Sequence, residues 1–157
     1  MKYRIDVLES FSFYGLTRKF SIINGANFRD IPKFWDEIME NGSFKAMISN
    51  ASDNRSLGVC MPMDMDIESN FDYVIGAFSD IPVDGYDFHI VETAEWAIFE
   101  LVGPISETIQ STWKYIYSQW YEETGYKHAK LPEFEVYTDG DVTSNDYYME
   151  IWIPIER

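Results

Sequence analysis

The chain has 157 residues, a length typical of a single domain with one substantial core, and 46% of them are hydrophobic. Twelve Lys and Arg residues stand against 27 Asp and Glu residues, which gives a net charge of −15 at pH 7. This charge argues against direct nucleic-acid binding and would attract cations to any cleft.

The sequence also argues against disulfide, membrane and secreted classes. Cys60 is the single cysteine, so neither an internal disulfide nor a thiolate metal site can form. The first residues lack the apolar segment of a signal peptide, and no stretch has the length of a membrane-spanning helix. We therefore expect a cytoplasmic protein that contacts no membrane.

The first half of the chain predicts two strands, a helix and two further strands. The predicted strands are residues 3–8, 11–17, 57–61 and 71–78. Apolar side chains recur at helical spacing at Ile31, Phe34, Trp35 and Ile38. Asn27 and Asp30 are candidate N-caps for this helix. Pro32 suits its first turn, and Asn41-Gly42 suits its end.

The second half predicts the same order of elements. Its strands are residues 87–92, 96–102, 134–137 and 147–155. Its helix carries an apolar face at Ile109, Trp113, Ile116 and Trp120. Ser106 is the candidate N-cap, and Thr124-Gly125 suits the end. The segment Trp35–Ile38 also aligns with Trp113–Ile116, which indicates an internal duplication.

This order predicts an α+β domain. Duplicated β-α-β-β units with pseudo-twofold symmetry would form a mostly antiparallel sheet, with a ligand cleft between the two halves. No Pro- or Ser-rich linker divides the sequence, so we expect residues 1–157 to form one domain, with halves of about 1–80 and 81–157. No DNA-binding domain is recognisable.

Glu150 is the most informative polar residue because it stands in an otherwise apolar strand. Side chains alternate along a strand, so Glu150 shares a face with Trp152. A carboxylate beside an indole in an interior strand needs a partner, and a large apolar cation would supply one. An edge strand in water, or a bridge to Lys or Arg, explains Glu150 equally well.

Aromatic residues are unusually dense in the second predicted helix. Trp113, Tyr117, Trp120 and Tyr121 exceed what one buried stripe requires, so Tyr117 or Trp120 is expected to face a cavity. Trp35 is the counterpart of Trp113 in the first half, and at least one of this pair is expected in the core.

The sequence predicts no metal and no cofactor. His89 and His128 lie in no metal-ligand spacing. Asp64, Asp66 and Glu68 alternate like part of a calcium loop but lack its glycine and terminal glutamate, so we interpret them as a solvated acidic turn. No phosphate-binding loop and no serine-nucleophile motif is present.

Several segments, in order along the chain, resemble the GyrI-like family of small-molecule-binding domains. They are IPKFW (31–35), LGVC (57–60), FDYVIG (71–76), WAIFE (96–100), GPI (103–105), TWKYIYSQW (112–120) and EIWIP (150–154). The resemblance implies two pseudosymmetric β-α-β-β units with a hydrophobic ligand cleft between them. Members of this family serve as effector domains of AraC- and MerR-type transcription activators, and this chain resembles a stand-alone form.

The resemblance also implies a site in which a carboxylate among aromatic rings engages cationic, amphiphilic ligands. Carried over to this sequence, the ligand-binding residues are Glu150, Trp152, Tyr117, Trp120, Trp113, Trp35 and Tyr73. The first expectation is therefore binding of a hydrophobic, cationic or amphiphilic small molecule.

Two alternatives stay open. Stand-alone relatives resemble hydrolases that detoxify reactive cyclopropane-type DNA-alkylating compounds, in which case Glu150 and Tyr117 would be catalytic. Others resemble acidic modulators of DNA gyrase, so a protein partner such as a topoisomerase or a transcription factor is the further expectation.

Overall fold

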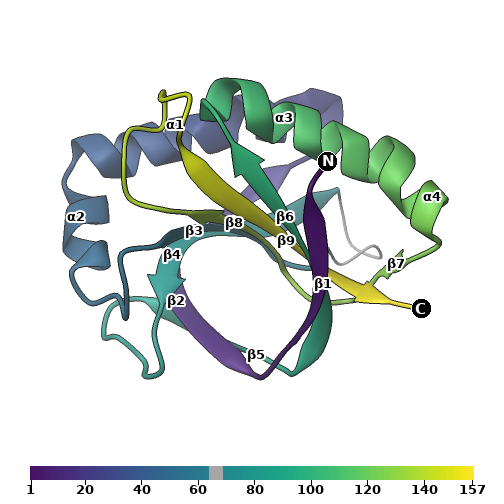
Figure 1. Cartoon of the computed structure of the whole chain (residues 1–157). Coiled ribbons are helices and arrows are strands. Elements are labelled where there is room, and N and C mark those ends of the chain that lie inside the picture. Colours follow the sequence, from purple (N-terminus) through teal and green to yellow (C-terminus); the bar gives the residue numbers. More distant parts are fainter. Residues whose placement is uncertain (64–68) are drawn as a thin grey trace.

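The computed structural model describes residues 1–63 and 69–157 and contains one open sheet with helices on one face (Figure 1). The predicted acidic turn at Asp64, Asp66 and Glu68 lies outside the described residues. The elements of the first half are β1 (Tyr3–Leu8), β2 (Phe11–Ser21), α1 (Ala26–Glu40), α2 (Ser43–Ile48), β3 (Ser56–Cys60) and β4 (Asn70–Phe78). Those of the second half are β5 (Asp87–Val91), β6 (Ala94–Val102), α3 (Ile105–Tyr115), α4 (Tyr121–Thr124), β7 (Lys127–His128), β8 (Glu133–Tyr137) and β9 (Tyr148–Glu156).

The strand order shows the symmetry that the sequence predicts. The sheet runs β1-β6-β9-β8-β3-β4-β2-β5, with β7 paired to β9, and each pairing is antiparallel. The unit β2-α1-β3-β4 therefore mirrors the unit β6-α3-β8-β9, and β3 pairs with β8 where the two units meet. The strand that precedes each unit pairs with the first strand of the other unit. Strand β1, which precedes the first unit, pairs with β6, and β5, which precedes the second unit, pairs with β2. This confirms the α+β class with repeated β-α-β-β units.

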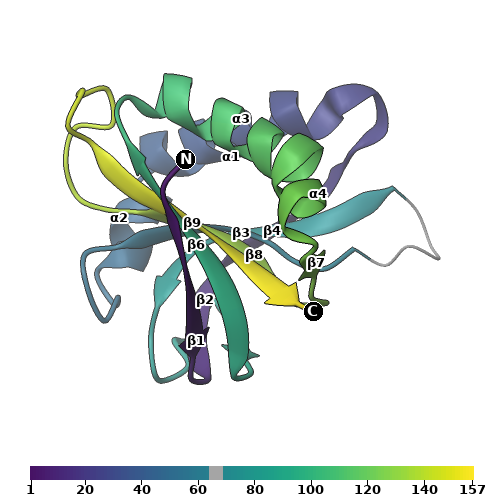
Figure 2. The same ribbon diagram turned by 45° about the vertical axis from the view of Figure 1, so that its right-hand side comes forward.

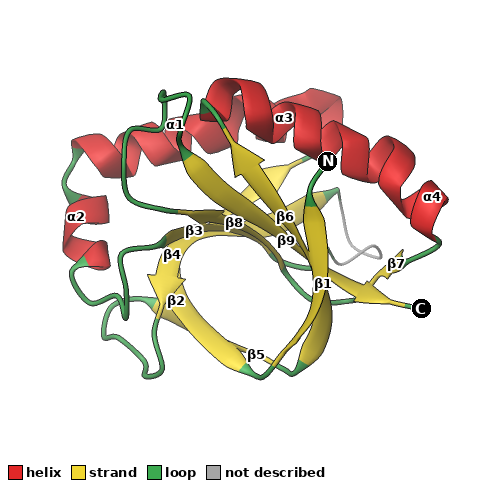
Figure 3. Ribbon diagram, viewed as in Figure 1, coloured by secondary structure: helices red, strands yellow, loops and turns green. Residues whose placement is uncertain are grey.

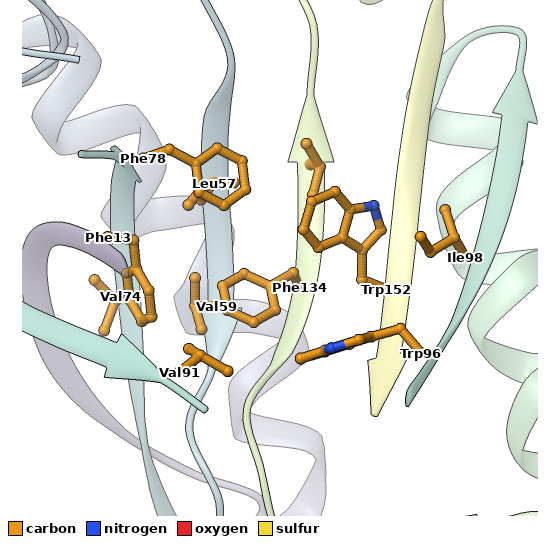
Figure 4. Close-up of a cluster of buried hydrophobic side chains, with 11 residues drawn as sticks. Phe13, Leu57, Val59, Val74, Phe78, Val91, Trp96, Ile98, Phe134 and Trp152 are labelled. Carbon is orange, nitrogen blue, oxygen red and sulfur yellow. The ribbon is translucent and has the colours of Figure 1, made fainter. Parts of the chain in front are cut away.

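Helices α1 and α3 lie side by side over one face of the sheet (Figures 2 and 3). The apolar stripe of α1 packs Phe34 and Ile38 into a core with strands β2 and β4. The helical segment that continues α3 packs Ile116 and Trp120 against β6 and β9. The opposite face of the sheet curls around a third apolar cluster (Figures 1 and 4), to which none of the described helices contributes a residue.

Helix boundaries differ from the predicted ones. Helix α1 begins at Ala26, after Gly25 at φ +70°, so Asn27 and Asp30 lie inside it and neither caps it. Helix α3 begins at Ile105 after an extended Pro104, which leaves the predicted cap Ser106 within the first turn. Short helix α2 was not predicted. None of the helices in the described parts of the chain is long and apolar enough to cross a membrane.

The long helix of the second half, which begins as α3, changes its winding above the sheet. Helix α3 passes into a π-helical segment, Ile116–Trp120, which continues directly into α4. Isolated π-helical turns of this kind are frequent at functional sites. The ring of Tyr117, at the start of this segment, stacks on Trp113 at 5.9 Å and lies 5.7 Å from Tyr121. The helix thus presents a row of three rings at intervals of four residues.

Candidate functional site

The candidate site lies on strand β8, where the two units meet. Phe134 and Val136 point into the cluster on the helix-free face (Figure 4 shows Phe134). Strand alternation therefore directs Glu133, Glu135 and Tyr137 toward the helices. Because β8 is flanked by β3 and β9, these side chains cannot turn aside to a solvated sheet edge.

Glu135 is held by aromatic donors from both units. Trp113 of α3 donates its indole N–H to Oε2 over 3.0 Å. The hydroxyls of Tyr137 and Tyr73 donate to Oε1 over 3.2 and 3.4 Å. The indole N–H of Trp35, on α1, donates in turn to the Tyr73 hydroxyl over 2.9 Å. The donors to Glu135 among the described residues are therefore neutral, and its negative charge has no cationic partner there.

The surroundings of Glu135 alter its protonation. Burial raises the pKa of the Glu135 carboxyl above its ordinary value, and the neighbouring Glu133 carboxylate adds to the rise. The hydrogen bonds from Trp113, Tyr137 and Tyr73 oppose it by stabilising the ionised form. A cation bound beside Glu135 would lower this pKa and favour the charged carboxylate.

Strand β3 makes room for Glu135 by having glycine opposite it. Gly58 pairs with Glu135 across the two units. A Cβ atom at Gly58 would lie 2.2 Å from the Tyr73 hydroxyl and 3.0 Å from Oε1 of Glu135. The absence of a side chain at Gly58 therefore allows the tyrosine and the carboxylate to meet over the backbone of β3.

Glu133, two residues earlier on the same face, has a different set of partners. The Tyr117 hydroxyl donates to its Oε2 over 2.5 Å, and Nε2 of His128 lies 3.1 Å from the same oxygen. Nδ1 of His128 lies 2.5 Å from the carbonyl oxygen of Ala129. Burial lowers the pKa of His128, but the hydrogen bond and charge of Glu133 outweigh it and raise the pKa overall.

The His128–Glu133 pair makes the stability of the fold depend on pH. Because the pKa of His128 is raised in the folded state, the pair stabilises the protein fully at acidic pH, and this contribution is lost as pH rises through the raised pKa. We expect His128→Gln to lower the free energy of unfolding by about 0.5–1 kcal/mol at pH 5.5 and by less at pH 9. Urea unfolding at both pH values measures this, and an equal loss at both would contradict it.

The structure brings together four of the seven sequence-predicted ligand-binding residues. Trp35, Tyr73 and Trp113 surround Glu135, and Tyr117 contacts Glu133. Trp35 and Trp113 are only partly buried, so both rings are in part accessible to solvent. Trp120 instead lies fully buried in the core, against Phe99, Tyr121 and Tyr126.

Glu150 and Trp152 lie on the helix-free face of the sheet, apart from the other five predicted residues. Oε1 of Glu150 accepts the indole N–H of Trp152 over 2.9 Å. Its Oε2 accepts the Tyr148 hydroxyl over 2.5 Å and lies 3.4 Å from Nη1 of Arg4. Glu150 therefore has a cationic partner, whereas Glu135 has none among residues 1–63 and 69–157.

Trp152 belongs to the third apolar cluster and borders a surface hollow. Its ring stacks on Phe78 at 5.5 Å and lies 6.0 Å from Phe134 (Figure 4). The hollow, of about 360 Å³, is also lined by Phe11 and Arg55. This hollow opens away from the helices, so a ligand there would not touch Glu135.

Sequence reasoning missed the two carboxylates of β8, together with Tyr137 and His128. The signal was present, because Glu133-Phe134-Glu135-Val136-Tyr137 alternates acidic or polar with apolar residues. No group of three or more His, Cys, Asp or Glu residues within 1–63 and 69–157 is arranged to hold a metal ion.

Comparison with known proteins gives one family and a consistent set of folds. The family model of the GyrI-like small-molecule-binding domain matches residues 1–156. The structure of SAV2435 bound to tetraphenylphosphonium is 24% identical, has a TM-score of 0.86, and is aligned over 99% of this chain and 94% of that chain. No curated protein sequence matches the chain.

Other solved structures share the fold. A putative transcription regulation protein from Staphylococcus aureus is 24% identical, with a TM-score of 0.84 over 100% of this chain and 99% of that chain. The C-terminal domain of EcmrR is 16% identical, with a TM-score of 0.61 over 99% and 98% of the two chains. With the family model covering almost every residue, the chain belongs to the GyrI-like small-molecule-binding domain family.

Proposed function

We propose that this domain binds hydrophobic organic cations between helices α1 and α3, with Glu135 as the negative group that neutralises the ligand. The observation that carries the proposal is the set of donors to the Glu135 carboxylate, which within the described parts of the chain are Trp113, Tyr73 and Tyr137 and are all neutral. A buried negative charge without a cationic partner is costly, and a bound cation would relieve that cost.

The aromatic rings around Glu135 would add a second attraction for a bound cation. Trp113 donates directly to the carboxylate, whereas Trp35, in the other unit, donates to the hydroxyl of Tyr73, and the ring of Tyr137 lies 5.4 Å from Trp35. Aromatic faces attract organic cations by about 0.5–2 kcal/mol per contact, depending on desolvation. The net charge of −15 adds a long-range attraction for cations. The relative SAV2435 has been solved with tetraphenylphosphonium, which makes this cation a suitable probe.

The proposal predicts a strong preference for positive charge at constant ligand shape. Tetraphenylphosphonium and tetraphenylborate have nearly the same size and surface but opposite charge. We expect saturable quenching of tryptophan fluorescence by the cation, because the indole groups of Trp35 and Trp113 lie at the site. The anion should bind at least about 100-fold more weakly, a difference of roughly 2.7 kcal/mol. Equal affinities for the two ions would contradict the proposal.

A further inference from the structure

Glu133 already has a partner within the chain that becomes a cation when protonated, the imidazole of His128. His128 directs Nδ1 at the carbonyl oxygen of Ala129 and Nε2 at Oε2 of Glu133. Both partners are acceptors, so each ring nitrogen must carry a proton to donate to its partner. The geometry therefore suits the protonated imidazolium, whose two ring nitrogens can both donate, with Nε2 directed at Glu133.

The two carboxylates of β8 lie in one row beneath the aromatic helix. Glu133 and Glu135 are alternate residues of one strand, so their backbones are about 6.5–7 Å apart. Trp113 donates to Glu135, and Tyr117, stacked on Trp113, donates to Glu133. A flat ligand along this row would meet both carboxylates and both rings. Side-chain exposures of 16% for Glu133 and 32% for His128 place this end of the row near solvent.

We propose that Glu133 is a second cation subsite, and that an aromatic dication binds Glu133 and Glu135 together by displacing the imidazolium of His128 from Glu133. This inference rests on the proposed function, since Glu135 must bind the first positive charge. The inference adds a class of ligand to that function, namely rigid dications. Their two charges would be about 7 Å apart, which matches the spacing of alternate residues along a strand.

Replacement of His128 by the dication at Glu133 is coupled to the release of a proton. Once Glu133 pairs with the ligand, His128 loses the contact that keeps it charged, and the proton on Nε2 passes to solvent. The other groups that face His128 are Tyr121 on α4, whose ring lies 6.5 Å away, and Glu156 on β9. Glu156 continues to favour the charged form, so release amounts to at most one proton per dication. Cys60 on β3 faces Glu133, and burial raises the pKa of its thiol, so it stays neutral.

A matched pair of ligands tests the inference. N,N′-dimethyl-4,4′-bipyridinium is a rigid dication, and N-methyl-4-phenylpyridinium has nearly the same shape with one charge fewer. By isothermal titration calorimetry at pH 8.5, we expect the wild-type protein to bind the dication at least tenfold more tightly than the monocation. At pH 6 the advantage should shrink, because His128 then competes for Glu133. A titration at about pH 7, where His128 is partly protonated in the free protein, in two buffers of different ionisation enthalpy should show proton release with the dication only.

Two variants assign these effects. Glu133→Gln should bind the dication no more tightly than it binds the monocation, and a circular dichroism spectrum like that of the wild type shows that the variant is folded. His128→Gln keeps a donor toward Glu133 without a titrating group, so it should bind the dication without proton release and with little dependence on pH.

The outcomes separate this inference from the proposed function. Monocation binding that depends on Glu135, with no advantage for the dication, would overturn the second subsite alone. Proton release that persists in His128→Gln would overturn the exchange. Failure of both ligands to bind the wild-type protein would overturn the proposed function together with the inference.

Discussion

Replacing Glu135 by glutamine is expected to weaken tetraphenylphosphonium binding by about 30- to 150-fold, a loss of roughly 2–3 kcal/mol. Glutamine has the same shape, and its oxygen can accept from Trp113 while its amide N–H groups donate to the hydroxyls of Tyr73 and Tyr137, which can also accept, so the main loss is the charge. Fluorescence titration of the purified variant measures the loss. Acidification should weaken wild-type binding in the same way, because protonation through the raised pKa of Glu135 removes the charge.

Glu150→Gln is the matched control for that experiment. Glu150 lies on the other face of the sheet and is already paired with Arg4, so its substitution should change the affinity for the cation by less than about threefold. The site carried over from the family resemblance predicts instead that Glu150→Gln weakens binding of the cation strongly. A large loss in Glu150→Gln with little change in Glu135→Gln would move the ligand to the helix-free face and contradict the proposed site.

Gly76→Ala is expected to have the largest effect on stability, a loss of about 3 kcal/mol in the free energy of unfolding. Gly76 faces Gly15 where strands β2 and β4 pair. A Cβ atom at Gly76 would lie 2.0 Å from the carbonyl oxygen of Tyr14 and 3.2 Å from the Cα atom of Gly15. These are backbone atoms of a paired strand, so they cannot move aside as the end of a flexible side chain could. Urea unfolding followed by circular dichroism measures the change.

Gly85→Ala provides the comparison. Gly85 has φ +89°, and a Cβ atom there would meet nothing within 4 Å, so only backbone strain opposes alanine, at about 1 kcal/mol. A loss in Gly76→Ala no larger than that in Gly85→Ala would show that the two strands separate easily. The close approach of β2 and β4 would then not constrain the sheet.

Local patterns predicted most of the elements, because each is determined by neighbours in the sequence. The predicted strand at residues 3–8 coincides with β1, and Thr124-Gly125 ends the second helix, where Gly125 adopts φ +77°. Helix starts were less predictable. Helix α1 begins five residues before Ile31, directly after Gly25 in the left-handed conformation, and no capping side chain marks this start.

The candidate site depended on information that no local pattern contains. Glu150 and Glu135 both lie in strands with apolar neighbours, and the alternation along each strand was readable. What distinguishes them is the partner across the sheet. Strand β1 brings Arg4 to Glu150, whereas β3 brings Gly58 to Glu135. Strand order arises from long-range pairing, so the sequence could not show which carboxylate lacks a cation.

The most direct measurement is a crystal structure of the protein with tetraphenylphosphonium. The account predicts the phosphonium between α1 and α3, with Trp35 and Trp113 against its phenyl rings and Glu135 as the nearest negative group. Density for the cation in the hollow beside Trp152, on the opposite face of the sheet, would contradict the account.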